Sequence, residues 1–236
     1  MRIQVRIKAI LFDKDGTIFS FQESWGNWFF SLSRKLADGN NRDLEKIFIE
    51  FDFDNSKKKF NIGSKFASST FEENIERFKR ILPSKSKKQI MQTAIESTKE
   101  INQIPVTNLT AFFLNLKSRN LLLGVVTNDL EETTINQLKK NKIYNFFDYI
   151  VGSNSGYGAK PEPGQLNQFC KRFKIKPSNV MMVGDTLHDL IAGKKAKMNT
   201  VGVLTGIAKK SELLLETNYV VNDISEILKI MDDSFT

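Results

Sequence analysis

Acidic residues that directly follow short apolar runs are the most chemically suggestive feature of this 236-residue chain. Asp13 and Asp15 come immediately after an apolar run that ends at Phe12, and Gly16 and Thr17 follow them. A carboxylate can act as a nucleophile, and a second carboxyl group beside it can donate and accept protons. Taken alone, the segment is equally compatible with an acidic turn, because Asp-Gly pairs are common in turns.

Further polar groups occupy comparable places later in the chain. Thr127 and Asn128 follow a second apolar run, Lys160 precedes a proline, and Asp185 and Asp189 follow a third apolar run. Ligands of open α/β sheets bind beyond the carboxyl ends of the strands. If the apolar runs are parallel strands, all of these groups therefore meet at one edge of a sheet.

Such a collection is suited to a phosphoryl group. Converging carboxylates repel each other unless a cation lies between them, and Mg²⁺ prefers carboxylate, water and phosphate oxygens. The Lys160 ammonium can oppose the remaining negative charge. Asp13 can attack phosphorus to form an aspartyl-phosphate, and Asp15 can protonate the leaving oxygen and then activate water.

The elements that must position these groups can be inferred from the hydrophobic pattern. Apolar runs alternate with amphipathic stretches after Pro105, which predicts a doubly wound parallel sheet with helices on both faces. We expect strands at residues 7–12, 121–126, 149–151, 180–183, 200–204 and 219–221. We expect helices at residues 109–116 and 131–140, after Pro163, at residues 187–197 and at the end of the chain.

Residues 18–104 have a different pattern and are called here the inserted region. Trp25 and Trp28 stand at helical spacing, and the apolar residues from Phe71 to Leu82 form an amphipathic pattern that ends at Pro83. No strand-like alternation dominates, so we expect this region to be all-helical. We therefore divide the chain into an α/β core, residues 1–17 plus 105–236, and an inserted helical cap, residues 18–104.

Composition limits the classes of partner. The formal net charge is +8, from 35 basic and 27 acidic residues, which suits anionic partners. Nucleic-acid binding is not favoured, because the lysines form no single stripe with interleaved aromatic residues. One cysteine, Cys170, excludes an internal disulfide, and no signal peptide or membrane-spanning run is present. We expect a cytoplasmic monomer or homodimer with no membrane association.

The motifs resemble those of the haloacid dehalogenase-like superfamily. D-K-D-G-T, V-V-T-N-D, G-Y-G-A-K-P-E-P and V-G-D-T-L-H-D occur in the order that this superfamily shows, and they span residues 13–189. The flanking segment after the fourth motif is most similar to the phosphoglycolate phosphatase-like branch. The resemblance covers nearly all of the α/β part and little of the inserted region.

The resemblance implies roles for the acidic residues. Asp13 would be the nucleophile and a metal ligand, and Asp15 would be the acid/base group that also lends its backbone carbonyl to Mg²⁺. Asp185 would bind the metal, and Asp189 would support the metal shell or Lys160.

The resemblance also implies how a substrate is held. Thr127 and the backbone of Asn128 would bind the phosphoryl group, while Lys160 would neutralise it and orient Asp13. The inserted region resembles the mobile cap that selects substrates. A Mg²⁺-dependent phosphatase for a small phosphorylated metabolite, with phosphoglycolate as the first candidate, is therefore the expected function.

Two alternative functions are compatible with these motifs, and two residues depart from the pattern of the superfamily. A sugar-phosphate phosphomutase would share every core motif, and a non-enzymatic binding or regulatory module would share the fold. Lys14 stands where relatives usually have an apolar residue, and Ser20 stands where many have an acidic one. Trp25 and Trp28 can contact substrate or pack the helices of the inserted region, and packing is favoured. His188 stands close to the predicted site, but a catalytic role is not favoured because Asp15 already supplies the acid–base group.

Overall fold

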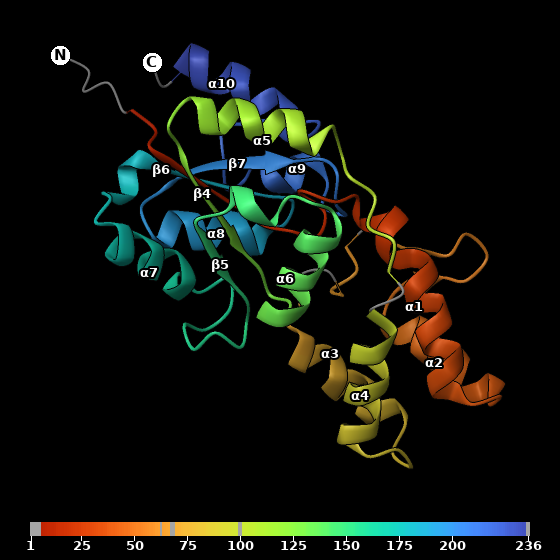
Figure 1. Ribbon diagram of the computed structural model, residues 1–236. Coiled ribbons are helices and arrows are strands. Elements are labelled where there is room, and N and C mark those ends of the chain that lie inside the picture. Colours follow the sequence, from red (N-terminus) through yellow and green to blue (C-terminus); the bar gives the residue numbers. More distant parts are fainter. Residues whose placement is uncertain (1–5, 62, 67–68, 99–100, 235–236) are drawn as a thin grey trace.

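A six-stranded parallel sheet forms the centre of the larger part of the molecule (Figure 1). The computed structural model describes residues 6–61, 63–66, 69–98 and 101–234. The strands of the sheet are β1 (Ala9–Phe12), β4 (Leu122–Val126), β5 (Tyr149–Val151), β6 (Val180–Gly184), β7 (Asn199–Val203) and β8 (Val220–Val221). Their order is β5-β4-β1-β6-β7-β8, with β1 between β4 and β6. The chain winds to one side of β1 and then to the other, which confirms the predicted doubly wound α/β fold.

Helices cover both faces of this sheet because successive side chains of a strand point to opposite faces. Ile10 and Phe12 of β1 belong to a hydrophobic cluster with α5 (Leu109–Ser118) and α10 (Ile227–Ser234). Ala9 and Leu11 belong to a second cluster with α7 (Gly164–Phe173) and α8 (Leu187–Lys195). Figure 1 shows α5 and α10 on one side of the sheet and α7 and α8 on the other. The remaining elements of this part are α6 (Glu131–Lys140), α9 (Lys210–Leu213) and the 3-10 helices at Tyr144–Phe146, Pro177–Asn179 and Ile224–Glu226.

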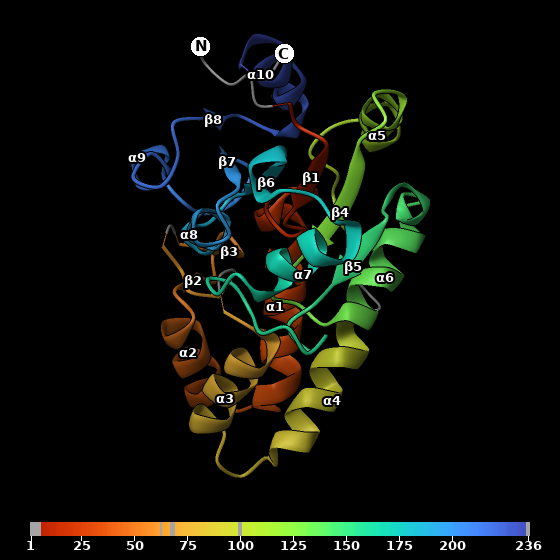
Figure 2. The same ribbon diagram turned by 90° about the vertical axis from the view of Figure 1, so that its left-hand side faces the viewer.

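The inserted region packs around a core of its own. Its helices are α1 (Phe21–Ala37), α2 (Asn41–Glu50), α3 (Phe71–Ile81) and α4 (Lys87–Thr98). They lie together beyond one edge of the sheet in both views (Figures 1 and 2). Their buried side chains form a third hydrophobic cluster, in which the Phe29 ring lies 5.1 Å from that of Phe51 and 4.8 Å from that of Phe60. The division of the chain into residues 1–17 plus 105–236 and residues 18–104 stays a prediction.

The expectation that the inserted region is all-helical is wrong in one detail. Two short antiparallel strands, β2 (Phe53–Asp54) and β3 (Lys59–Phe60), form a hairpin between α2 and α3. Each strand has only two residues, which is too short to produce an alternating pattern in the sequence. Phe53 and Phe60 pair directly and are buried in the cluster of the inserted region.

The chain passes between the core and the inserted region through two neighbouring segments. Ser20 N donates to Ile104 O at 2.8 Å, and Val106 N donates to Ile18 O at 3.2 Å. Phe19 and Pro105 form an antiparallel bridge between these bonds. The outgoing and returning segments are therefore paired, as an insertion requires. Across the described parts of the chain, no helix combines the length and the apolar character that crossing a membrane demands.

Candidate active site

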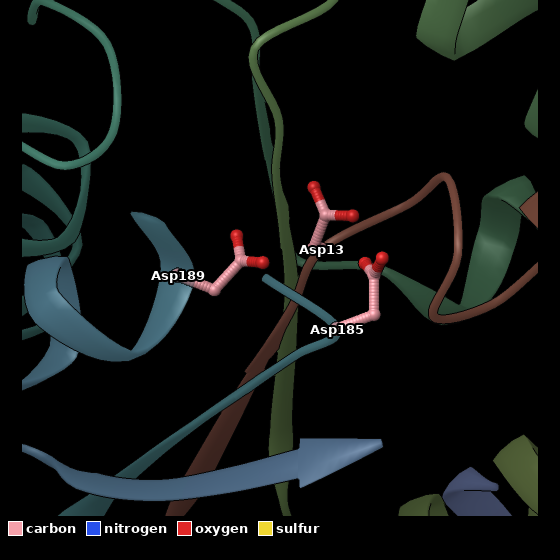
Figure 3. A group of neighbouring side chains, drawn as sticks. All are labelled: Asp13, Asp185 and Asp189. Carbon is pink, nitrogen blue, oxygen red and sulfur yellow. The ribbon is translucent and has the colours of Figure 1, made fainter. Parts of the chain in front are cut away.

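The predicted site residues meet at the carboxyl edge of the sheet because three neighbouring strands end there. Asp13 follows β1, Thr127 and Asn128 follow β4, and Asp185 follows β6. Figure 3 shows Asp13, Asp185 and Asp189 directed into one small volume, with Asp189 coming from the first turn of α8. Each residue has one carboxylate oxygen that lies within 4.8 Å of a carboxylate oxygen of each of the other two. The topology thus places three buried carboxylates beyond the carboxyl ends of the strands, where ligands of open α/β sheets bind.

Lys160 is the cation at the centre of this cluster. Its Nζ donates to Asp13 Oδ1 and to Asp189 Oδ1, each at 2.6 Å, and to the carbonyl of Val126 at 2.8 Å. Burial alone would lower the pKa of Lys160, but the two carboxylates outweigh it and raise that pKa. The ammonium is therefore charged, and it fixes the orientation of the Asp13 carboxylate.

Asn128 positions Lys160 through a two-way contact that the sequence did not indicate. Its Nδ2 donates to Lys160 O, and its Oδ1 accepts from Lys160 N, both at 2.9 Å. The side chain of Asn128 thereby ties the end of β4 to the segment that carries the lysine. The interpretation from the sequence assigned a role only to the backbone of this residue.

The acidic cluster carries more negative charge than Lys160 can balance. Burial, together with the neighbouring carboxylates Asp189 and Asp15, raises the pKa of Asp13 to about 7, against the opposing effect of Lys160. Burial and the charges of Asp13 and Asp189 also raise the pKa of Asp185. Three carboxylates face one ammonium, so the site favours a further cation.

The donor atoms fit a hard divalent ion such as Mg²⁺. Asp185 Oδ1 accepts from Thr17 Oγ1 at 3.2 Å, while the buried Asp185 Oδ2 has no hydrogen-bond partner among the described residues. A Cβ added at Gly206 would lie 1.7 Å from that oxygen, and one at Gly16 would lie 2.3 Å from it. Two glycines thus keep space beside Asp185. Unpaired carboxylate oxygen is the ligand that Mg²⁺ prefers.

Asp189 has a supporting position instead. Its Oδ1 accepts from Lys160, and its Oδ2 accepts from both the backbone N and the Oγ1 of Thr186, at 3.0 and 2.7 Å. Both oxygens are therefore engaged within the protein. This arrangement favours Asp13 and Asp185 over Asp189 as candidate ligands.

Asp15 lies in a second network, on the side of the inserted region. Its Oδ1 accepts from Trp25 Nε1 at 2.8 Å and from Gln103 Nε2 at 3.4 Å. Lys14 Nζ lies 2.5 Å from Asp15 Oδ2 and 3.1 Å from Asp129 Oδ2. Residues from both ends of the inserted region thus hold the carboxylate of Asp15.

Lys14 is the residue of this network that the sequence marked only as a departure. It is fully buried, and its Nζ also donates to the side chain of Gln137. Burial would lower the pKa of Lys14, but Asp15 and Asp129 raise it above its ordinary value. Lys14 follows directly on a buried apolar strand, and a lysine that is itself buried there needs acidic or polar partners. Apart from the adjacent Asp15, the sequence could not name those partners, since Gln137, for example, is 123 residues away.

A pocket extends from the acidic cluster to the inserted region. Asp13, Asp15, Thr127 and Lys160 line its inner end. Trp25, Trp28 and His188 line its walls, together with other residues of α1, α3 and α4. All three side chains therefore face the pocket, and for the two tryptophans substrate contact was one of the two interpretations that the sequence allowed.

A doubly wound α/β core with buried carboxylates at the carboxyl edge of its sheet defines a known class of hydrolases. The profile of the family described as haloacid dehalogenase-like hydrolase matches residues 10–203, from β1 to β7. The chain belongs to this family.

Individual relatives carry more specific names. A pyrophosphatase PpaX from Oceanobacillus iheyensis is 30% identical over 121 residues, which is 51% of this chain and 56% of that protein. A phosphoglycolate phosphatase from Aquifex aeolicus is 26% identical over 227 residues, 96% of this chain and 98% of that protein. Among solved structures, a predicted phosphoglycolate phosphatase from Haemophilus somnus has a TM-score of 0.73 at 21% identity, covering 95% of this chain and 98% of that one.

Proposed function

We propose that this protein is a Mg²⁺-dependent phosphatase that hydrolyses a small phosphorylated metabolite through an aspartyl-phosphate on Asp13. The observation that carries the proposal is the sharing of Lys160 Nζ between Asp13 and Asp189, with the unpaired Asp185 Oδ2 beside them. This arrangement offers an oriented nucleophile and a place for a cation at one end of a pocket. Membership of a hydrolase family with relatives named phosphatases supports the same reaction.

The chain's own residues can carry out both steps. An Asp13 carboxylate oxygen attacks phosphorus, the bond between phosphorus and the ester oxygen breaks, and Asp15 gives that oxygen a proton. Asp15 then accepts a proton from water, whose oxygen attacks phosphorus and releases phosphate and free Asp13. The Thr127–Asn128 turn holds the phosphoryl oxygens, and the positive charge of Lys160 beside them offsets their negative charge. Mg²⁺, held by Asp13, Asp185 and the backbone carbonyl of Asp15, would supply positive charge opposite the phosphoryl group.

Two variants and a chelator test this function. Asp13→Asn and Asp15→Asn should each lose turnover of phosphate esters, and chelation should abolish the activity of the native protein. Asp232→Asn is the matched control, because Asp232 pairs with Arg119 at the surface, away from the site. Wild-type turnover by Asp13→Asn would sink the mechanism.

The products distinguish hydrolysis from phosphoryl transfer between sugar positions. Release of inorganic phosphate supports the phosphatase. Isomerisation of a sugar phosphate in the presence of a bisphosphate activator would instead support the phosphomutase alternative, which would use the same core residues.

We propose a cytoplasmic monomer or homodimer in which residues 18–104 form a cap on the core. Size-exclusion chromatography with light scattering tests the oligomeric state. Salt-dependent binding to DNA or RNA would contradict the expectation that nucleic acid is not a partner.

A further inference from the structure

The two ends of the active-site pocket differ in polarity. The inner end carries the carboxylates and Lys160, whereas the end formed by the inserted region is lined mostly by aromatic and aliphatic side chains. These include Trp25, Trp28, Leu32, Phe66, Phe71 and Ile75. The phosphoryl group must occupy the inner end, so the rest of the substrate must face the apolar end.

The polar atoms of the two tryptophans are already used inside the protein. Trp25 Nε1 donates to Asp15 Oδ1 at 2.8 Å, and Trp28 Nε1 donates to Ser97 Oγ at 3.0 Å. The two rings meet edge to face, with centroids 4.8 Å apart. They therefore offer ring surface to a substrate and no hydrogen-bond donor.

One side-chain amide at the apolar end of the pocket offers a hydrogen-bond acceptor. Asn74 lines the pocket, and its Nδ2 donates to Phe66 O at 3.2 Å. Its buried Oδ1 has no partner among the described residues. An acceptor suits a hydroxyl or N–H group and disfavours the oxygens of a second anionic group.

Among the described residues that line the pocket, no lysine or arginine lies at the apolar end. Lys160 is the only lysine or arginine among them, and its three contacts are Asp13, Asp189 and Val126 O. His188 is the other basic side chain. Asp15 and Asp129 add negative charge at the junction of the two ends.

We propose that the substrate is a phosphomonoester of an uncharged, largely apolar alcohol, such as an aryl or arylalkyl phosphate. The inference rests on the proposed phosphatase function and specifies its substrate class. Hydrolysis breaks the bond between phosphorus and the ester oxygen, and that oxygen leaves with a proton as the neutral alcohol. A carboxylate or second phosphate in the same place would be buried against aromatic rings without a lysine or arginine to pair with. Phosphoglycolate, the first candidate from the sequence, and pyrophosphate are therefore expected to be poor substrates.

Competing substrates test the proposal directly. With Mg²⁺ present, kcat/KM for benzyl phosphate should exceed that for phosphoglycolate and for pyrophosphate by at least about tenfold, since unpaired polar groups in a pocket discriminate strongly. A ratio below tenfold for either anionic substrate overturns the proposal, while phosphatase activity as such would stand. Absence of turnover with all three compounds contradicts the proposed function, and the binding experiment below then decides the substrate class.

Tryptophan fluorescence gives a readout that does not depend on turnover. Trp25 and Trp28 are the only tryptophans in the chain, and both line the pocket. Titration with benzylphosphonate should change their emission with a Kd at least about tenfold lower than that of phosphonoacetate. Equal or tighter binding of phosphonoacetate would refute the substrate class.

A charge introduced into the apolar wall provides the complementary variant. Phe71 is half-buried at the start of α3, so an arginine there can reach both the pocket and solvent. Phe71→Arg should shift the kcat/KM ratio of benzyl phosphate to phosphoglycolate at least about tenfold toward phosphoglycolate. Ile49→Arg is the matched control, because Ile49 is 70% exposed on α2 and does not line this pocket. An unchanged ratio in a folded Phe71→Arg protein would count against the proposal.

Discussion

At the scale of single residues, Lys160 compensates for the buried acidic cluster. Lys160→Ala would leave Asp13, Asp185 and Asp189 without their ammonium partner. We expect kcat/KM to fall by about 10²-fold or more at saturating Mg²⁺, the usual effect of removing a preorganised charge stabiliser. Steady-state kinetics on protein shown to be folded by circular dichroism measures this. Lys195→Ala, which breaks an exposed pair with Glu162, should keep the native rate. An unchanged rate in Lys160→Ala would refute its assigned role.

Lys14 should act mainly on stability. Lys14→Met keeps a long side chain at this buried position but leaves Asp15 and Asp129 facing each other without a cation. We expect a loss of about 3–5 kcal/mol in the free energy of unfolding, as for a buried ion pair that loses one partner. Denaturant unfolding at pH 7.5 measures it.

A second substitution separates charge from packing at Lys14. Adding Asp129→Asn to Lys14→Met should recover part of the lost stability, because it removes an uncompensated buried charge. Lys57→Met, which breaks an exposed pair with Asp54, should cost less than about 1 kcal/mol. If Lys14→Met lost no more free energy of unfolding than Lys57→Met, the buried ion pair would not stabilise the fold.

The sequence was informative about which residues gather and uninformative about how they pair. Asp13, Asp185 and Lys160 follow or approach strand ends, so a coarse reading of strands was enough to place them at one edge. The contacts between Asn128 and Lys160, or between Lys14 and Gln137, depend on side-chain rotamers and on segments 32 and 123 residues apart. No local pattern encodes such pairings.

At the scale of elements, the start of α3 links the inserted region to the catalytic edge. Thr70 Oγ1 accepts from Glu73 N at 3.1 Å, and Glu73 Oε2 accepts from Thr70 N at 2.7 Å, which forms a capping box. Phe71 N, the next amide, donates to Asn128 O at 3.3 Å. The first turn of α3 therefore rests on the turn that follows β4.

The hydrogen bond from Glu73 N to the Thr70 hydroxyl should contribute measurably to the stability of the fold. Thr70→Ala should lower the free energy of unfolding by about 1 kcal/mol, whereas Thr70→Ser should remain close to the native value. Urea unfolding of the three proteins measures the difference. Equal loss in both variants would mean that the hydroxyl cap is not the source of stability at this helix start.

Elements were predictable where they are long or buried on both faces. The expected strands and helices after residue 105 agree with β4 to β8 and α5 to α8 to within a few residues. The hairpin of β2 and β3 was missed because pairing of Phe53 with Phe60 is decided by packing against Phe29, and not by local alternation. Tertiary contacts determine such short strands.

At the scale of the whole molecule, the α/β core and the inserted region together line one pocket. The paired segments at Phe19 and Pro105 are the covalent connection, and Trp25, Gln103 and Phe71 reach from the inserted region to Asp15 and Asn128. The chemistry is thus supplied by one part and the apolar wall by the other. A change in the inserted region should accordingly alter substrate choice more than the reaction itself.

The stability of the whole molecule should depend on pH and Mg²⁺ together. The raised pKa of Asp13, about 7, means that the folded protein holds this proton more tightly than the unfolded chain, whose Asp13 has the ordinary value of 3.8. Between these values the folded state binds more protons, so stability falls as pH rises through the window and the loss is complete above it. Asp185 acts in the same direction.

Mg²⁺ binds the ionised carboxylates, so its stabilising effect should grow over the same window. Thermal unfolding should therefore show a larger rise in Tm with 10 mM Mg²⁺ at pH 8 than at pH 5, and Asp185→Asn should suppress that rise. A rise in Tm that is equal at both pH values, or that persists in Asp185→Asn, would place the ion elsewhere.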